Sequence, residues 1–88
     1  MKYILYKAPD GLRAAVFPVP TTHAEEAAAH PTWQPISAGF VEFLSAGNVR
    51  CFGRSESLKL AADPSDSSII EVMMSATLKF CAPQPIST

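Results

Sequence analysis

The chain has 88 residues, of which 48% are hydrophobic and 17% are charged. This length leaves room for one compact core and no second domain, and the composition is too apolar for an intrinsically disordered chain. Seven Lys and Arg residues against eight Asp and Glu give a net charge of −1 with no dense basic run, which argues against nucleic-acid binding. Because a domain of this size has a thin stability margin, we expect a homo-oligomer, most simply a dimer.

The first predicted unit is a β-hairpin. Residues 2–8 carry the β-branched and aromatic side chains that are typical of a strand, and Pro9, Asp10 and Gly11 then supply a turn. The return strand is predicted over residues 12–19, because the two prolines near its end remove backbone donors.

A short helix is predicted next. Thr22 and Glu25 have the spacing of a capping box, in which each side chain accepts a hydrogen bond from the other residue's backbone amide. An alanine stripe would let this helix approach a sheet closely, and Pro31 ends it just after His30. An irregular link follows.

The second hairpin is predicted from residues 36–44 and 49–52, joined by a four-residue loop that contains Gly47 and Asn48. Residues 54–60 follow with mixed signals. A short helical turn and an irregular edge segment are both compatible with them.

A second helix is predicted to begin at Pro64, with Asp63 as its N-cap and Asp66 adding a favourable charge near the positive end of the helix dipole. Its apolar positions recur every three or four residues and are predicted to form the core face: Ile69, Val72, Met73 and Ala76. The periodicity ends after about residue 78. We therefore predict one α+β domain over residues 1–78 and an extended or disordered C-terminal tail over residues 79–88.

These elements give the order ββα-ββα. The simplest arrangement is a four-stranded, mainly antiparallel sheet with both helices on one face, which would cover two apolar helix stripes. Separately placed hairpins are the alternative.

The polar segment 53–57 is the best candidate for a binding site. Glycine allows a sharp turn, successive amides and the hydroxyls of Ser55 and Ser57 can hold an anion, and Arg54 can clamp a phosphate or carboxylate. The segment has neither a P-loop lysine nor a GxGxxG pattern. Serines that cap a turn, beside a solvated arginine, are the alternative.

Other chemistries have little support. His23 and His30 lie seven residues apart, about 10 Å along a helix, which is too far for one metal ion, and His23 is expected at the surface. Cys51 and Cys81 lack zinc-site spacing and are expected to be free, mostly buried thiols. No catalytic motif is present, so we expect neither an enzyme nor a metal or cofactor.

The aromatic residues exceed what one sheet face must bury, which favours an exposed interaction surface. Trp33, held between two prolines, is the best anchor, and Arg50 on the second hairpin is a further interface candidate. Trp33 as a lid over the edge of the core is equally compatible. The sequence has no apolar run long enough for a membrane span and no signal-peptide pattern at its start, so we expect a cytoplasmic protein with no membrane partner.

Four segments of the chain form a distinctive combination: the strand Ser37-Ala38-Gly39-Phe40-Val41, the Gly-x-Ser-x-Ser-Leu segment that begins at Gly53, the acidic cap at Asp63 and the helix start Thr22-His23-Ala24. This combination resembles small uncharacterised proteins encoded by tailed phages and prophages. The resemblance covers about residues 2–76. It implies expression in a bacterial cytoplasm, where small phage proteins often bind and block a host factor such as a defence system. No site residue transfers from it.

These observations favour a small non-enzymatic interaction protein that binds or inhibits a host protein. The alternative is a protein that binds a nucleotide or another anion through residues 53–57. An enzyme that uses Cys51 or a histidine is the third hypothesis, and it requires a reactive thiol near neutral pH.

Overall fold

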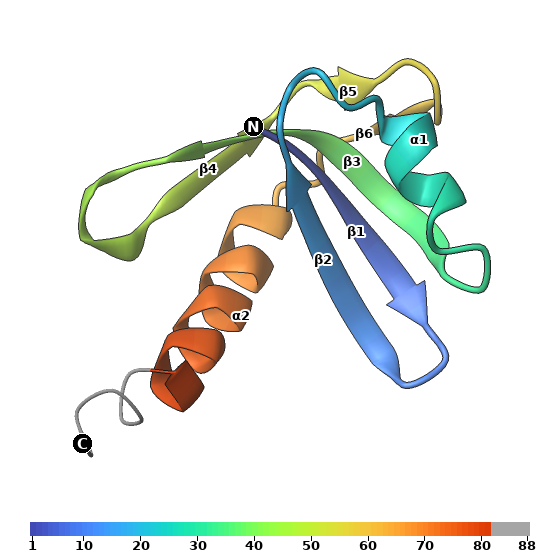
Figure 1. Ribbon diagram of the computed structural model, residues 1–88. Coiled ribbons are helices and arrows are strands. Elements are labelled where there is room, and N and C mark those ends of the chain that lie inside the picture. Colours follow the sequence, from blue (N-terminus) through green and yellow to red (C-terminus); the bar gives the residue numbers. More distant parts are fainter. Residues whose placement is uncertain (82–88) are drawn as a thin grey trace.

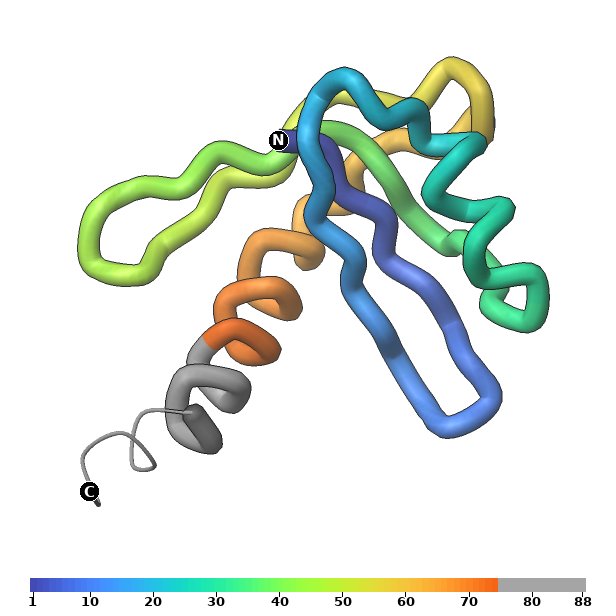
Figure 2. The backbone as a smooth tube through the Cα atoms, in the orientation of Figure 1, coloured from blue at the N-terminus to red at the C-terminus, as the bar shows by residue number. Residues whose placement is uncertain are grey.

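The main sheet of the protein has four antiparallel strands in the order β2-β1-β3-β4 (Figure 1). The structure is a computed structural model that describes the backbone of residues 1–81 and the side chains of residues 1–74. The strands are β1 (Lys2–Ala8), β2 (Gly11–Phe17), β3 (Gln34–Phe43) and β4 (Val49–Phe52). Beyond β1 and β2, β3 continues into a hairpin with β4 that projects to one side (Figure 2).

The remaining elements follow the chain between and after these strands. They are α1 (His23–Ala28), the 3-10 turn η1 (Ser45–Gly47), β5 (Arg54–Ser55), β6 (Leu60–Ala61) and α2 (Asp66–Cys81). The segment with mixed sequence signals is therefore a small hairpin, in which β5 pairs with β6 in a separate two-stranded sheet. The predicted α+β class with a four-stranded antiparallel sheet is confirmed.

Strand β1 is buried on both faces, and this corrects the predicted placement of the helices. Tyr3 and Leu5 pack with Ile70 of α2 on one face. Ile4 and Tyr6, which alternate with them, pack on the other face beside α1, Trp33 and the β5–β6 hairpin. The helices thus lie on opposite faces of the sheet and not on one, because both faces of the central strand are apolar. In Figure 1, β1 and β3 pass between α2 and α1.

Helix α2 also differs from its predicted core face and bounds. Val72 was predicted in the core but is 68% exposed, whereas Ile70 is 1% exposed and contacts the core. The apolar residues from 69 to 74 cover more than half of the helix circumference, so periodicity alone does not select the buried side. The helix runs to Cys81, because the first proline, at position 83, comes later; the rest of the predicted tail lies outside the described residues.

The predicted cap at Asp63 is present, although the helix itself begins at Asp66. The Asp63 carboxylate accepts a hydrogen bond from the Ser65 amide at 2.9 Å, and the Asp63 amide donates to Asp66 Oδ2 at 3.0 Å. Hydrogen bonds from the hydroxyl and the amide of Ser65 lower the pKa of the Asp63 carboxyl. The reciprocal bonds hold the chain as it enters the helix.

Side chains of α2 cover the outer edge of β4. The Val49 amide donates to Glu71 Oε2 at 2.7 Å, and the Cys51 amide donates to Ser67 Oγ at 3.0 Å. An edge strand otherwise presents unpaired amides to other chains. These bonds therefore fix the helix to the sheet and close part of that edge.

The phenol of Tyr3 joins the centre of the sheet to the start of α2. It donates a 2.5 Å hydrogen bond to Asp66 Oδ2, and both residues are 1% exposed or less. Burial, together with the Asp66 carboxylate, raises the pKa of Tyr3 above its usual range, which keeps it a donor. On the opposite face, the buried Tyr6 hydroxyl has no hydrogen-bond partner among the described residues.

This pair of tyrosines gives a matched test of the fold. Tyr3→Phe is expected to lower the free energy of unfolding by about 1.5–3 kcal/mol, because it removes a hydrogen bond to a buried carboxylate. Tyr6→Phe removes a buried hydroxyl that bonds to nothing described, so it should be neutral or slightly stabilising. Urea denaturation of both variants measures the difference. Equal losses would contradict the assigned role of the Tyr3 to Asp66 bond.

Candidate anion-binding pocket

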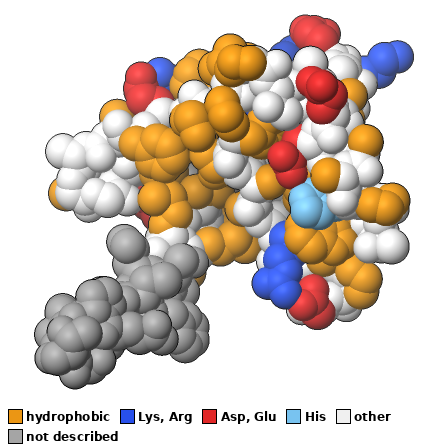
Figure 3. Space-filling view, in the orientation of Figure 1, with side chains coloured by type: hydrophobic (Ala, Val, Ile, Leu, Met, Phe, Trp, Pro, Cys, Tyr) orange, Lys and Arg blue, Asp and Glu red, His pale blue; other side chains and the backbone are white. Residues whose placement is uncertain are grey.

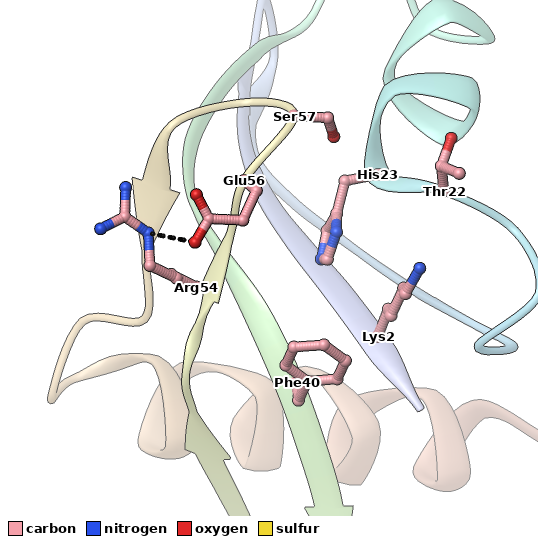
Figure 4. Close-up of a pocket in the computed structure, with 7 residues that line it drawn as sticks. All are labelled: Lys2, Thr22, His23, Phe40, Arg54, Glu56 and Ser57. Carbon is pink, nitrogen blue, oxygen red and sulfur yellow. Dashed lines mark ion pairs between the residues drawn. The ribbon is translucent and has the colours of Figure 1, made fainter.

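An open pocket of about 470 Å³ lies where β1, β3, the start of α1 and the β5–β6 hairpin meet (Figure 4). Its lining combines basic, acidic, hydroxyl and aromatic groups: Lys2, Thr22, His23, Phe40, Arg54, Glu56 and Ser57. Four stretches of the chain, far apart in sequence, therefore supply one site.

Lys2 and Thr22 form one side of the pocket. The Lys2 ammonium donates a 3.0 Å hydrogen bond to the Thr21 carbonyl oxygen. Thr22 caps α1 as predicted: its hydroxyl accepts from the Glu25 amide, and its own amide donates to the Glu25 carboxylate. These bonds to Thr22 lower the pKa of Glu25. The cap thus fixes the backbone that carries both Thr22 and His23.

His23 is buried and not at the surface as the sequence suggested, with an exposure of 4%. Its Nε2 lies 2.9 Å from the Gly39 carbonyl oxygen, which requires a hydrogen on that nitrogen. Edge contacts with the rings of Phe17 and Phe40 hold the imidazole in place. In the neutral ring, Nδ1 is then the acceptor nitrogen, so His23 can accept a hydrogen bond at this position.

The predicted segment 53–57 is only partly directed into the pocket. Gly53 has a φ of +74°, which supplies the turn into β5. Arg54 and Ser57 line the pocket, whereas Ser55 is buried and its hydroxyl accepts from the Leu58 amide at 3.2 Å. Ser55 therefore stabilises the turn, as the structural alternative for this segment proposed. Arg54 and Ser57 line the same pocket as Lys2, with the Arg54 guanidinium turned toward Glu56 on the side opposite Lys2 (Figure 4).

Glu56 pairs with Arg54 across the mouth of the pocket. Their Nε and Oε1 atoms are 3.4 Å apart, and the side chains are 56% and 84% exposed. Ion pairs this exposed contribute little and are screened by solvent. A ligand that carries a negative charge can therefore replace Glu56 beside Arg54 at low cost.

Gly39 of β3 allows the end of β4 and Gly53 to approach β3 closely behind the pocket. A Cβ atom at Gly39 would lie 2.5 Å from the Phe52 carbonyl oxygen and 3.3 Å from the Gly53 backbone. Only glycine fits this distance without movement of the backbone. The same residue accepts the hydrogen bond of His23. Gly39 therefore positions both His23 and the start of the predicted segment.

Beside this pocket lies a shallow groove of about 380 Å³, which shares Phe40 with it. Its lining is mostly apolar: Met1, Phe40, Val41, Glu42, Phe43 and Phe52. Phe43 is 47% exposed, and Phe52 stacks on Phe40 with ring centres 5.9 Å apart. The space-filling view shows hydrophobic side chains in an almost continuous band on one face (Figure 3). We refer to the groove formed by the six lining residues from Met1 to Phe52 named above as the apolar groove.

The two predicted interface residues occupy different places. Arg50 borders the apolar groove, with its guanidinium 4.3 Å from the centre of the Phe52 ring and its Nε 3.0 Å from Glu42 Oε1. Trp33 is half-buried on the other side of α1, stacked on His30 with ring centres 4.1 Å apart and edge-on to Tyr6. Trp33 thus lies as a lid over the core, and its role as an anchor for a partner stays a prediction.

Cys51 has the properties of a structural thiol. It is half-buried, and this burial is the main reason why its pKa is raised, so little thiolate exists near neutral pH. Within the described residues, no three His, Cys, Asp or Glu side chains are arranged to hold a metal ion. None of the described helices combines the length and hydrophobicity that crossing a bilayer requires.

Lys2 and His23 were not among the predicted site residues. Lys2 reaches the site because it pairs with Phe40 across the sheet, and His23 because its ring bonds to the carbonyl of Gly39. No spacing in the sequence signals either contact. Comparisons with protein-family models, curated proteins and solved structures gave no match to the chain. Proposals about its function therefore depend on its own residues.

Gly39→Ala tests the close approach behind the pocket. The added methyl group would meet backbone and not a flexible side chain, so we expect a loss of about 1–3 kcal/mol in unfolding free energy, together with changed amide shifts at residues 52–54. Gly47→Ala is the contrast, because it adds a methyl group in open space and carries only the cost of a positive φ, about 1 kcal/mol. Unchanged shifts at residues 52–54 in Gly39→Ala would contradict this account.

Proposed function

We propose that the protein is a non-enzymatic binding protein whose pocket holds a small anion, with a phosphate-bearing molecule such as a nucleotide as the preferred class. The observation that supports this is the presence of Lys2 and Arg54, from distant parts of the chain, in the lining of one pocket. Lys2 and Arg54 supply positive charge, and Arg54 has the fork geometry that suits phosphate. The Ser57 and Thr22 hydroxyls can donate to the remaining oxygens.

The shape of the pocket also suits a nucleotide. Phe40 forms an apolar wall next to the charged groups, and an aromatic face can stack on a base. A pocket of about 470 Å³ lies within the size range of small-molecule sites. A nucleotide would thus place its phosphate at Lys2 and Arg54 and its base toward Phe40.

The same pocket gathers three of the four motifs on which the resemblance to phage proteins depends; the acidic cap at Asp63 lies at the other pocket. Phe40 belongs to the Ser-Ala-Gly-Phe-Val strand, Arg54 and Ser57 to the segment that begins at Gly53, and His23 to the helix start. A common binding role for this surface would account for that combination. We propose accordingly that the protein acts in the cytoplasm of a bacterial host.

A thermal-shift titration with inorganic phosphate and nucleoside monophosphates tests the pocket. A ligand at about a hundred times its Kd stabilises the folded state by about 2.7 kcal/mol, which raises the melting temperature by several degrees. Arg54→Ala should weaken binding about tenfold or more, because it removes a charge-assisted contact. Arg13→Ala is the matched control, since Arg13 also forms an exposed ion pair, with Asp10, outside the pocket. A flat response to every anion would overturn the proposal.

The apolar groove supports a second candidate function, the binding of a host protein. Large exposed apolar side chains that gather in one groove are typical of protein-binding surfaces. Arg50 at the rim adds a residue type that is common in interfaces. In this proposal the chain binds a bacterial factor, such as a component of a defence system, through the groove. Homodimerisation stays a separate proposal.

Phe43→Ser tests this second candidate. The substitution should lower the free energy of unfolding by about 1 kcal/mol, because Phe43 is about half exposed, and it should abolish capture of a partner from bacterial lysate. Val19→Ser is the control, since Val19 is an exposed apolar residue outside the groove. Light scattering of the same samples reports the oligomeric state. Equal capture by wild type and Phe43→Ser would exclude the groove as the binding surface.

A further inference from the structure

A second, smaller pocket of about 170 Å³ lies on the opposite face of the sheet, at the start of α2. Its walls are apolar and one end is polar. The apolar side chains are Leu5, Leu12, Ile36 and Ile69, and the polar ones are Ser37, Asp63, Ser65 and Asp66. This volume is far above the ~10–15 Å³ that admits a single water molecule.

The Ser37 hydroxyl is the feature that points to a ligand. Ser37 is 5% exposed and lines the pocket, and its Oγ makes no hydrogen bond with any described residue. A buried hydroxyl without a partner destabilises the fold, so such groups are generally satisfied by a bound molecule or water. The register between β1 and β3 skips Ile36 in a bulge next to Ser37, so both residues line the pocket.

The groups at the polar end favour a cation over an anion. The amides of Asp63, Ser65 and Asp66 already donate within the turn, so they are not free to hold an anion. The carboxylates of Asp63 and Asp66 both line the pocket, and none of its described lining side chains is cationic. An anion would meet two negative charges there, whereas a cationic donor would be attracted.

The apolar walls narrow the class of cation further. Leu5 is buried at the pocket, while Leu12 and Ile36 are partly exposed at its rim. A metal ion would gain nothing from these side chains. An alkyl chain that ends in a primary ammonium group matches both parts, because its methylenes can cover apolar surface while its head reaches the carboxylates.

We propose that this pocket binds a primary alkylammonium group, with its alkyl chain against Leu12, Ile36 and Ile69 and its ammonium group among Ser37, Asp63 and Asp66. Such a group occurs in free alkylamines and in lysine side chains of other proteins. The site is independent of the anion pocket, because the two lie on opposite faces of the sheet and share no lining residue.

An NMR titration of the full chain with n-butylammonium chloride tests the proposal. We expect saturable shifts at the amides of residues 12, 37 and 63, and none with butyrate. Butanol, which has the same chain without the charge, should bind at least tenfold more weakly. Nα-acetyl-lysine methylamide distinguishes the sources: binding comparable to butylammonium points to a protein lysine, and markedly weaker binding points to a free amine.

Two variants locate the ammonium group. Ser37→Ala and Asp63→Asn should each weaken butylammonium binding about tenfold while the protein stays folded, because Asn can still accept the Ser65 amide bond. Glu56→Gln removes a carboxylate at the other pocket and should leave binding unchanged. The proposal is overturned if butylammonium gives no saturable shift, if butanol binds equally well, or if neither variant weakens binding.

Discussion

Burial of β1 on both faces is the constraint on which the other elements depend. Residues Tyr3 to Tyr6 are all 2% exposed or less, although a strand with one wet face would expose every second side chain. Each face therefore needs its own cover. Helix α2 supplies it on the Tyr3 face, and α1, Trp33 and the β5–β6 hairpin supply it on the Tyr6 face. An 88-residue chain achieves three layers in this way with only two helices among its described residues.

The two covers are attached to the sheet by different means. On the α2 side, polar bonds at the edge and centre of the sheet fix the helix, through Glu71, Ser67 and the buried pair of Tyr3 and Asp66. On the α1 side, aromatic contacts dominate, and the principal polar link is His23 to the Gly39 carbonyl. Since α1 is short, it covers only part of its face. The pocket lined by Lys2, Phe40 and Arg54 lies in the part that remains.

Local chemistry predicted much of this fold, because caps, turns and hairpins depend on neighbours in sequence. The box at Thr22, the cap at Asp63 and both hairpins of the main sheet follow from such signals. The buried face of α2 could not be predicted in this way. The apolar residues around Ile70 are nearly continuous in sequence and allow more than one buried face, so packing against the sheet decides between them. The site divides in the same way. Arg54 was predicted as a site residue from its own segment. Lys2 reaches the same pocket because β1 pairs with β3, and no local sequence pattern encodes that pairing.

The charge balance of the chain gives no indication of how its charges are arranged. A net charge of −1 argues against a broad basic surface, yet the fold separates the signs locally. Lys2 and Arg54 line one pocket on one face of the sheet, while Asp63 and Asp66 line another pocket on the opposite face. The electrostatic potential inside each pocket depends on the charged side chains nearby. The net charge of the chain, which adds both signs together, does not reveal it. Because the two pockets lie on opposite faces of the sheet, the strands separate the basic side chains of one from the acidic side chains of the other.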